Sequence, residues 1–331
     1  MLTNLSLLAI SKGPGFIVGP IARLLGVIYN AFFNILYGFF KNNALGLAII
    51  FFTLFIKLIL TPLLYKQQSS SFKMMALQPE MNKIKAKYAD KKDPASQQKM
   101  AYEMQKLQKE NGVSLVGGCL PLLIQLPILY ALFYIFQQPY NYVDVLGQGY
   151  AQIADAILKI PTDLRVEALY DIAIAKGVRL DLSVHSDILL LINNMTSVEW
   201  TQFYSAIGSY ADSIRPLVES TIGTQQFLGL NLSFKPGFAF PGILLPIVSG
   251  LSTWGSSKIL MANQPKMDSN DPAASMTKSM NIVMPIMMTV MTFSVPVGLG
   301  IYWISSNVIQ IVQSLIITRI LKNKQLKSKG A

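Results

Sequence analysis

The stretch Ala44–Leu64, ALGLAIIFFTLFIKLILTPLL, decides the class of this protein. At 1.5 Å of rise per residue, a helix of this length covers roughly 30 Å, the thickness of the hydrocarbon core of a bilayer. We therefore predict a membrane-spanning helix over 44–64. Its one charge is Lys57. An ionised amine there costs about 3 kcal/mol unless water or an anion meets it, so Lys57 is either tolerated or marks a site.

Composition points the same way, because 52% of the residues are hydrophobic and 14% are charged, with a mean hydropathy of +0.41. Since four further apolar stretches follow, we predict an all-α membrane protein, a five-helix transmembrane bundle. The single cysteine and single histidine exclude an intramolecular disulfide and a His-based metal site. We predict no catalytic residue, metal or cofactor, and no enzyme activity. The four further spans are predicted at Leu115–Phe136, Phe238–Ser257, Asn281–Val295 and Val297–Thr318.

Charge predicts the orientation in the cell inner (plasma) membrane. Residues 65–114 carry ten lysines and five acidic residues, and 319–331 carry five basic residues and no acid. Residues 137–237 carry six basic and ten acidic residues. Basic loops stay in the cytoplasm, so we expect a multi-pass protein with its N-terminus outside and its C-terminus cytoplasmic. Three basic residues before the first span oppose this assignment: Lys12, Arg23 and Lys41.

Residues 16–40 combine a narrow polar face with an apolar opposite face. Gly19, Arg23, Gly26, Asn30, Asn34, Tyr37 and Lys41 fall within an arc of about 80° on a helical wheel. This pattern predicts an outer interfacial amphipathic helix, and an additional spanning helix is the alternative.

Two polar segments separate the spans. Residues 66–111 predict a cytoplasmic helical hairpin, with Pro79 near a helix start, a turn at Asp90–Pro94 and Gly112 as terminator. It is either a solvated linker or a docking surface. Residues 139–226 predict a small helical domain outside.

The whole chain is expected to divide into nine segments. We expect an N-terminal segment with the interfacial helix (1–43), a span (44–64), the cytoplasmic hairpin (65–114), a span (115–136), an extracytoplasmic helical insertion (137–237), a span (238–257), a cytoplasmic loop (258–280), two spans (281–318) and a basic cytoplasmic tail (319–331).

Polar side chains line up inside the predicted spans. Thr53, Lys57 and Thr61 share one face of the first span, and Gly46 continues it. Gln125 stands among Leu and Ile in the second span. An arc of about 120° on the last span holds a polar stripe: Trp303, Ser306, Asn307, Gln310, Gln313 and Ser314. Such stripes face a bundle interior or a wet cavity.

Each polar residue has a simpler interpretation. Asn, Gln and Ser hold transmembrane helices together by hydrogen bonds, and a lysine can snorkel toward the nearest headgroups. No acidic residue occurs in the predicted spans to pair with Lys57. We therefore favour a water-filled groove that is open to the cytoplasm. A methionine stripe at 280, 284, 287, 288 and 291 slightly favours packing over an adaptable binding surface.

Several motifs together resemble the YidC/Oxa/Alb family of membrane-protein insertases. NGVSLVGGCLPLLIQLPILYALFY (111–134) resembles the family's second core helix, and PVGLGIYWISSNVIQIVQ (296–313) its final helix. GLAIIFFTLFIKLILTPLLYKQQ (46–68) resembles the first core helix, ALQPEMNKIKAKY (76–88) the hairpin, and FLGLNLSF (227–234) the segment before the third helix. The resemblance is closest to Gram-positive bacterial members.

The resemblance implies a membrane protein insertase and chaperone for protein transport, with a positively charged hydrophilic groove open to cytoplasm and lipid. Lys57 takes the place of the family's usual arginine, and Gln125, Trp303 and Gln313 match other groove positions. The expected partners are nascent membrane proteins, the lipid bilayer, the ribosome through the basic tail and hairpin, and the Sec translocon. A small-solute transporter or channel is the alternative function, and a structural assembly factor is a third.

Overall fold

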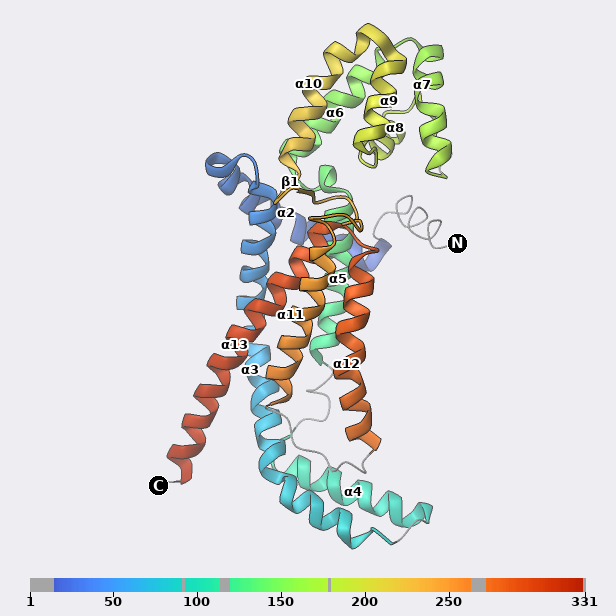
Figure 1. Cartoon of the computed structure of the whole chain (residues 1–331). Coiled ribbons are helices and arrows are strands. Elements are labelled where there is room, and N and C mark those ends of the chain that lie inside the picture. Colours follow the sequence, from blue (N-terminus) through green and yellow to red (C-terminus); the bar gives the residue numbers. More distant parts are fainter. Residues whose placement is uncertain (1–14, 91–92, 114–119, 178–179, 263–271, 330–331) are drawn as a thin grey trace. The chain divides into compact units, whose positions relative to one another are not determined.

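The computed structural model describes residues 15–90, 93–113, 120–177, 180–262 and 272–329, and nearly all regular structure in them is helical (Figure 1). The prediction of an all-α protein is confirmed at this level. Backbone contacts divide the chain into two compact units, and helices that cross the division contribute residues to both. Unit 1 is Met1–Phe52, Pro127–Leu245 and Thr292–Tyr302, and unit 2 is Thr53–Leu126, Pro246–Met291 and Trp303–Ala331.

Three described helices are long and apolar enough to cross a membrane. They lie within α2 (Gly15–Phe40), α3 (Ala44–Lys87) and α13 (Val297–Lys329). The predicted spans 44–64 and 297–318 fall inside the last two. By length and composition α2 also qualifies, so the two interpretations of residues 16–40 both remain.

The other predicted spans have different boundaries in the structure. The start of 115–136 lies outside the described residues, and α5 runs over Leu120–Gln137. The span predicted from residue 238 is shorter, because α11 (Leu244–Met261) begins after a run of prolines and glycines ending at Gly242. The helix predicted from residue 281 starts earlier, as α12 (Pro272–Thr292). Pro296 separates α12 from α13, as expected.

The helix α3 does not break where the sequence predicted a new helix start. It continues without interruption through Pro62 and Pro79 to Lys87, so the expectation of a start near Pro79 is wrong. A proline removes one backbone hydrogen bond, but the flanking Met, Ala, Leu, Gln and Glu residues favour helix and carry the chain through.

The turn after α3 follows the predicted signals. The helix α4 (Pro94–Glu110) begins at the N-cap Asp93, whose carboxylate accepts a hydrogen bond from the Ser96 amide at 2.8 Å. Gly112 follows its end with a φ of 64°, a conformation that suits glycine.

Side chains join the end of α3 to α4. Glu103 of α4 accepts hydrogen bonds from Lys87 at 2.7 Å and from the Tyr88 hydroxyl at 2.9 Å. Leu77, Met81 and Val113 form a small buried cluster, against which Met74, Met104 and Leu107 pack. We call these two helical segments the α3–α4 pair.

The methionine stripe of α12 is not a buried packing face. Met284, Met287 and Met291 are exposed, and Pro285 and Thr289 lie on the face where Gly250 of α11 comes close. The packing interpretation is therefore wrong for these three methionines. The side chain of Met280 lies outside the described residues. On the opposite face, Gly250 lets α11 and α12 approach closely, because a methyl group there would overlap Thr289.

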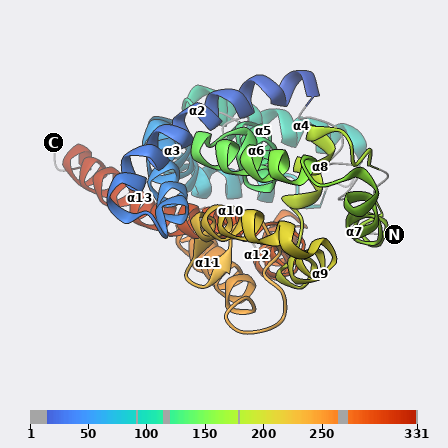
Figure 2. The same cartoon turned by 90° about the horizontal axis from the view of Figure 1, so that it is seen from above.

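The helical insertion has its own core. After the short 3-10 turn Pro139–Asn141 (η2) come α6 (Asp144–Leu158), α7 (Thr162–Ala175), α8 (His185–Ile192), α9 (Ser197–Ile207), the 3-10 turn Gly208–Tyr210 (η3) and α10 (Ala211–Thr224). The helices α6 and α10 lie side by side, as do α7 and α9 (Figure 2). Gly208, with a φ of 58°, ends α9. Buried Leu146, Ile153, Leu169, Ile188, Phe203 and Ile214 fill the interior.

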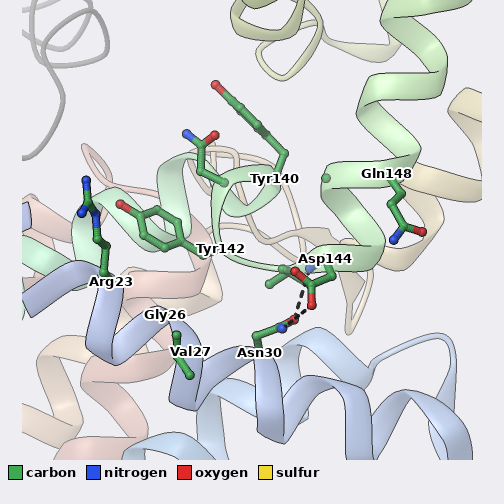
Figure 3. Close-up of a pocket in the computed structure, with 11 residues that line it drawn as sticks. Arg23, Gly26, Val27, Asn30, Tyr140, Tyr142, Asp144 and Gln148 are labelled. Atoms are coloured by element: carbon green, nitrogen blue, oxygen red, sulfur yellow. Dashed lines mark hydrogen bonds between the residues drawn. The ribbon is translucent and has the colours of Figure 1, made fainter. Parts of the chain in front are cut away.

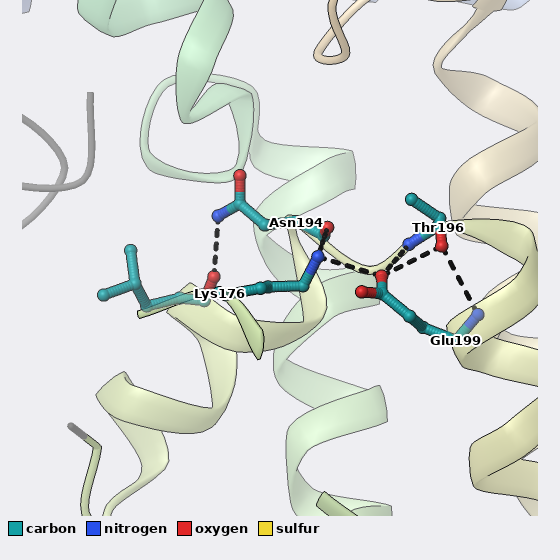
Figure 4. Close-up of polar contacts among 5 residues, drawn as sticks. Lys176, Asn194, Thr196 and Glu199 are labelled. Atoms are coloured by element: carbon teal, nitrogen blue, oxygen red, sulfur yellow. Dashed lines mark hydrogen bonds and ion pairs between the residues drawn. The ribbon is translucent and has the colours of Figure 1, made fainter. Parts of the chain in front are cut away.

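A polar network ties α7 to the start of α9 (Figure 4). Thr196 caps α9 and exchanges hydrogen bonds with Glu199 in a capping box. The Lys176 ammonium donates to the Asn194 carbonyl at 2.7 Å and lies 2.9 Å from the Glu199 carboxylate. Burial alone would raise the pKa of Glu199, but hydrogen bonds from Lys176 and Thr196 outweigh it and lower this pKa.

A pair of two-residue strands, missed by the sequence interpretation, leads out of the insertion in unit 1. The strands β1 (Gln226–Phe227) and β2 (Leu230–Asn231) pair antiparallel. The Phe227 ring lies on Gly46 of α3, where a methyl group would overlap it, so Gly46 serves packing and does not extend the polar line. The amides of Val297 and Gly298 donate to the carbonyls of Phe234 and Leu232, both at 2.8 Å. These bonds give acceptors to two backbone N–H groups in the first turn of α13, which have no partner within the helix.

Candidate polar site on helices α3 and α13

Lys57 lies on α3 in unit 2 and is half-buried. Its ammonium donates a hydrogen bond to the side-chain oxygen of Gln310 on α13 at 2.9 Å. An amide oxygen carries no net charge, so this contact satisfies one donor and leaves the positive charge of Lys57 uncompensated. A charge held in this way attracts a carboxylate more strongly than a charge already paired with an acid.

Gln313 connects the same two helices one turn further along. Its side-chain amide donates to the Lys57 carbonyl at 2.9 Å and to the Thr61 hydroxyl at 2.7 Å. The Thr61 hydroxyl in turn donates to the Lys57 carbonyl at 2.9 Å. The predicted polar faces of the first and last spans therefore meet at four residues: Lys57, Thr61, Gln310 and Gln313.

The other four predicted site residues are Asn307, Thr53, Trp303 and Gln125, and none of them takes part in the hydrogen bonds described above. Asn307 donates to Ser252 at 3.1 Å and to Thr253 at 2.9 Å, and so joins α13 to α11. Thr53 and Trp303 are buried, and Gln125 on α5 is half-buried. The function of each of these residues stays a prediction.

The polar contact extends beyond the predicted end of the first span. Gln68 of α3 donates to the Ser314 hydroxyl at 2.8 Å, and both side chains are buried. Residues 57, 61 and 68 recur with helical spacing, so continuing the wheel past Leu64 would have found Gln68. Further along, Lys324 donates to the Tyr65 hydroxyl at 3.0 Å.

Two buried acceptors in this contact lack donors. Among the described residues, no hydrogen-bond donor reaches the side-chain oxygens of Gln68 and Gln313. A buried carbonyl oxygen without a donor is costly, and such atoms usually meet water or a polar ligand. The α3–α13 contact therefore suits a hydrated environment. No group of three or more His, Cys, Asp or Glu suited to a metal occurs in the described part of the chain.

Residues 35–325 match the family model of the 60Kd inner membrane protein. A protein of Oceanobacillus iheyensis named membrane protein insertase YidC is 29% identical over 284 residues, covering 86% of this chain and 78% of the relative. A protein of Clostridium perfringens with the same name is 28% identical over 320 residues, covering 95% and 96%. Membrane protein insertase MisCA of Bacillus subtilis is 29% identical over 287 residues, covering 86% and 75%.

Proposed function

This chain belongs to the family of the 60Kd inner membrane protein, and from that premise we propose that it inserts proteins through a polar groove formed by α3 and α13. It is a multi-pass membrane protein insertase of the cell membrane, not an enzyme, and its substrates are nascent membrane proteins. A solute transporter or channel is not favoured, because these relatives are named insertases.

The contact between Lys57 and Gln310 carries the groove proposal. The proposed groove residues are Lys57, Thr53, Thr61, Trp303, Asn307, Gln310 and Gln313 on α3 and α13, together with Gln125 on α5. Because Gln310 is neutral, the Lys57 ammonium can exchange this amide oxygen for a carboxylate of a passing polypeptide without breaking an ion pair. The donor-free oxygens of Gln68 and Gln313 support hydration of the same contact.

Insertion by such a groove needs no bond chemistry. A polar segment that crosses hydrocarbon meets a large desolvation barrier. Water and polar side chains within the membrane shorten the apolar path, and Lys57 attracts acidic residues of the segment being moved. The substrate's own apolar helix then partitions sideways into lipid, which supplies the driving force.

The proposed topology has five spans, an outer interfacial α2, an outer helical insertion, and the α3–α4 pair and C-terminal tail in the cytoplasm. The distribution of lysine and arginine supports this orientation. In a Cys119→Ser background, reagents that modify single introduced cysteines from one side of the membrane test it. Labelling of the insertion from the cytoplasm would contradict the proposal.

The ribosome and the Sec translocon are proposed partners. The tail residues Arg319, Lys322 and Lys324 form a cluster of positive charge that suits ribosomal RNA, with an affinity that falls steeply with salt. Co-sedimentation with translating ribosomes at low salt checks the first partner, and loss of residues 322–331 should weaken it.

Replacement of Lys57 tests the groove. We expect Lys57→Arg to retain insertion, since charge and reach survive. Lys57→Ala should fold but lose insertion of substrates with Asp or Glu in the translocated segment, by about tenfold for one lost charge-assisted contact. Substrates with neutral translocated segments should be affected much less. The measurement is protease protection of radiolabelled substrates in proteoliposomes.

If Lys57 only snorkels, Lys57→Ala would be fully active on acidic substrates and equally or more stable. A Lys57→Cys variant that also carries Cys119→Ser would then resist polar thiol reagents added from the cytoplasmic side. Either result contradicts the groove without contradicting membership of the insertase family.

A further inference from the structure

A cavity of about 700 Å³ lies in unit 1 between α2 and the segment that leads into α6 (Figure 3). Arg23, Gly26, Val27 and Asn30 of α2 form one wall. The other wall is polar, with Tyr140, Tyr142, Asp144 and Gln148 among its residues. The polar face of α2 thus lines a cavity beside α6.

Packing and hydrogen bonds fix the two walls. The Asn30 amide donates to the Asp144 carboxylate at 2.7 Å, and the Asp144 backbone amide donates to the Asn30 side-chain oxygen at 3.1 Å. A methyl group at position 26 would lie 2.5 Å from the Tyr142 ring, so Gly26 permits this close contact. The cavity is therefore held in a defined shape without a ligand.

The cavity carries two opposite charges that are not paired with each other. The exposed Arg23 extends beside Tyr142 (Figure 3), whereas Asp144 is held by Asn30. Among the described residues, neither Arg23 nor Asp144 forms an ion pair. Residues 23 and 30 are two helical turns apart, about 10 Å along α2. The cavity therefore suits a ligand that carries a negative and a positive group at opposite ends.

Two tyrosines line the cavity, and one of them adds a hydrogen-bond donor beside Arg23. Burial raises the pKa of Tyr140 to about 12. Burial also raises the pKa of Tyr142, although the charge of Arg23 opposes this. Both hydroxyls stay protonated at neutral pH. The Tyr142 hydroxyl lies toward Arg23 and can donate to a phosphate oxygen there, whereas Tyr140 points away from Arg23 (Figure 3).

An apolar strip flanks the polar cavity. Leu24 is 64% exposed and Val27, which also lines the cavity, is 70% exposed. Phe16, Ile35 and Phe39 continue the exposed apolar side of α2. In a membrane protein such a strip faces acyl chains. A ligand with a dipolar head and apolar chains fits both surfaces.

We propose that this cavity binds the headgroup of an aminophospholipid such as phosphatidylethanolamine. The phosphate lies against Arg23 and the Tyr142 hydroxyl, the primary ammonium donates to Asp144, and the acyl chains run along Leu24 and Val27. Phosphatidylcholine has a quaternary amine that cannot donate a hydrogen bond, and phosphatidylglycerol has no cation. The site therefore discriminates by headgroup.

Lipid retention by the full-length protein tests the proposal. The protein is placed in nanodiscs of equal parts phosphatidylethanolamine, phosphatidylcholine and phosphatidylglycerol, extracted gently, and its retained lipids are measured by mass spectrometry. We expect enrichment of phosphatidylethanolamine, reduced about tenfold in Arg23→Gln and in Asp144→Asn, for one charge-assisted hydrogen bond each. Matched controls are Lys41→Gln, an exposed cation just after α2, and Asp163→Asn, an exposed acid in the first turn of α7.

The outcomes separate the possible sources of binding. Equal retention in all variants, or equal loss in both controls, overturns the proposal. Displacement of the lipid by millimolar free phosphoethanolamine assigns the site to a soluble phosphorylated amine and overturns the lipid as ligand. If a variant fails to fold, the unmodified protein still tests the proposal. Stepwise N-methylation of the lipid headgroup should lower the amount of that lipid retained by the protein. Unchanged retention across that series rejects the role of Asp144.

Discussion

The Lys57 ammonium is held by an amide where a carboxylate would bind it more tightly. A carboxylate at position 310 would pair with Lys57 permanently, and a substrate acid would then have to displace it. The neutral partner keeps the lysine in place and available. The identity of residue 310 should therefore matter as much as that of residue 57.

Gln310→Glu supplies the internal counter-charge that the site lacks. We expect the variant to be at least as stable as the unmodified protein, yet to insert substrates with acidic translocated segments about tenfold more slowly, as Lys57→Ala does. Gln68→Glu is the matched control, since it adds the same charge on the Ser314 contact and not at Lys57. Thermal unfolding and protease-protected insertion are measured together. Undiminished insertion of acidic substrates by Gln310→Glu would show that Lys57 does not attract them.

Glu199 gives a pH-dependent contribution to stability. Its pKa is lower in the folded chain than its ordinary value of 4.5. Its stabilisation is therefore complete above about pH 4.5 and is lost as the pH falls through the lower folded value. Glu199→Gln should cost on the order of 1 kcal/mol at pH 7, and the difference from the unmodified protein should shrink in acid. Glu167→Gln, at an exposed position of α7, is the control for thermal unfolding of the full chain. A difference that stays constant from pH 7 to pH 3 would exclude this ionisation.

At the scale of elements, the contact of β1 with α3 requires a glycine at position 46, against which the Phe227 ring packs. Gly46→Val would place a branched side chain where the Phe227 ring lies, and we expect a loss of about 1–3 kcal/mol. Gly38→Ala on α2 is the control, because a methyl group there meets nothing within 4 Å and alanine favours helix. The free energy of unfolding in detergent distinguishes the two. Equal stability of both variants would show that the Phe227 contact is dispensable.

Turn and capping residues in the sequence predicted one helix boundary correctly and another wrongly. The turn before α4 could be predicted because Asp93, Pro94 and Gly112 act on their own neighbours. Pro79 looked like a helix start for the same kind of reason, yet the flanking residues carry α3 through it. The exposed side of α12 could not be predicted, since a stripe of methionines has the same periodicity whether it packs or faces outward.

Periodicity also located most of the polar contact between α3 and α13. It gives the face of each helix, so Lys57, Thr61, Gln310 and Gln313 could be expected to meet. It does not give the register between two helices, or the neighbours on a third. The helical wheel therefore predicts Asn307 on the same stripe, although in the structure its side chain donates to Ser252 and Thr253 of α11.

At the scale of the molecule, the helical insertion should be separable from the inserting machinery. Its helices pack on one another around their own core, and no predicted groove residue comes from it. We expect a variant that joins Phe136 to Phe227 through a flexible linker to insert proteins at an unchanged rate. The same variant should lose its preference for phosphatidylethanolamine, because Tyr142 and Asp144 are gone. A folded but inactive product would contradict the first expectation.

The arrangement around α2 shows why sequence alone could not predict its contact with the start of α6. Its polar face was assigned from a helical wheel, and that assignment is compatible with a surface helix. In the structure, Asn30 of that face bonds to Asp144, which is 114 residues away in the chain. A partner so distant leaves no local trace in the pattern of α2.

The unbroken course of α3 through Pro79 has a mechanical consequence. Lys57 and Met81 stand on one helix, about 36 Å apart along its axis. At about 5 Å from the helix axis, a rotation of about 20° moves a side chain through an arc of about 2 Å. That arc is enough to break a 2.9 Å hydrogen bond to Gln310. We therefore expect that a rotation of the α3–α4 pair, where α3 carries it along its length, would weaken the hydrogen bond between Lys57 and Gln310.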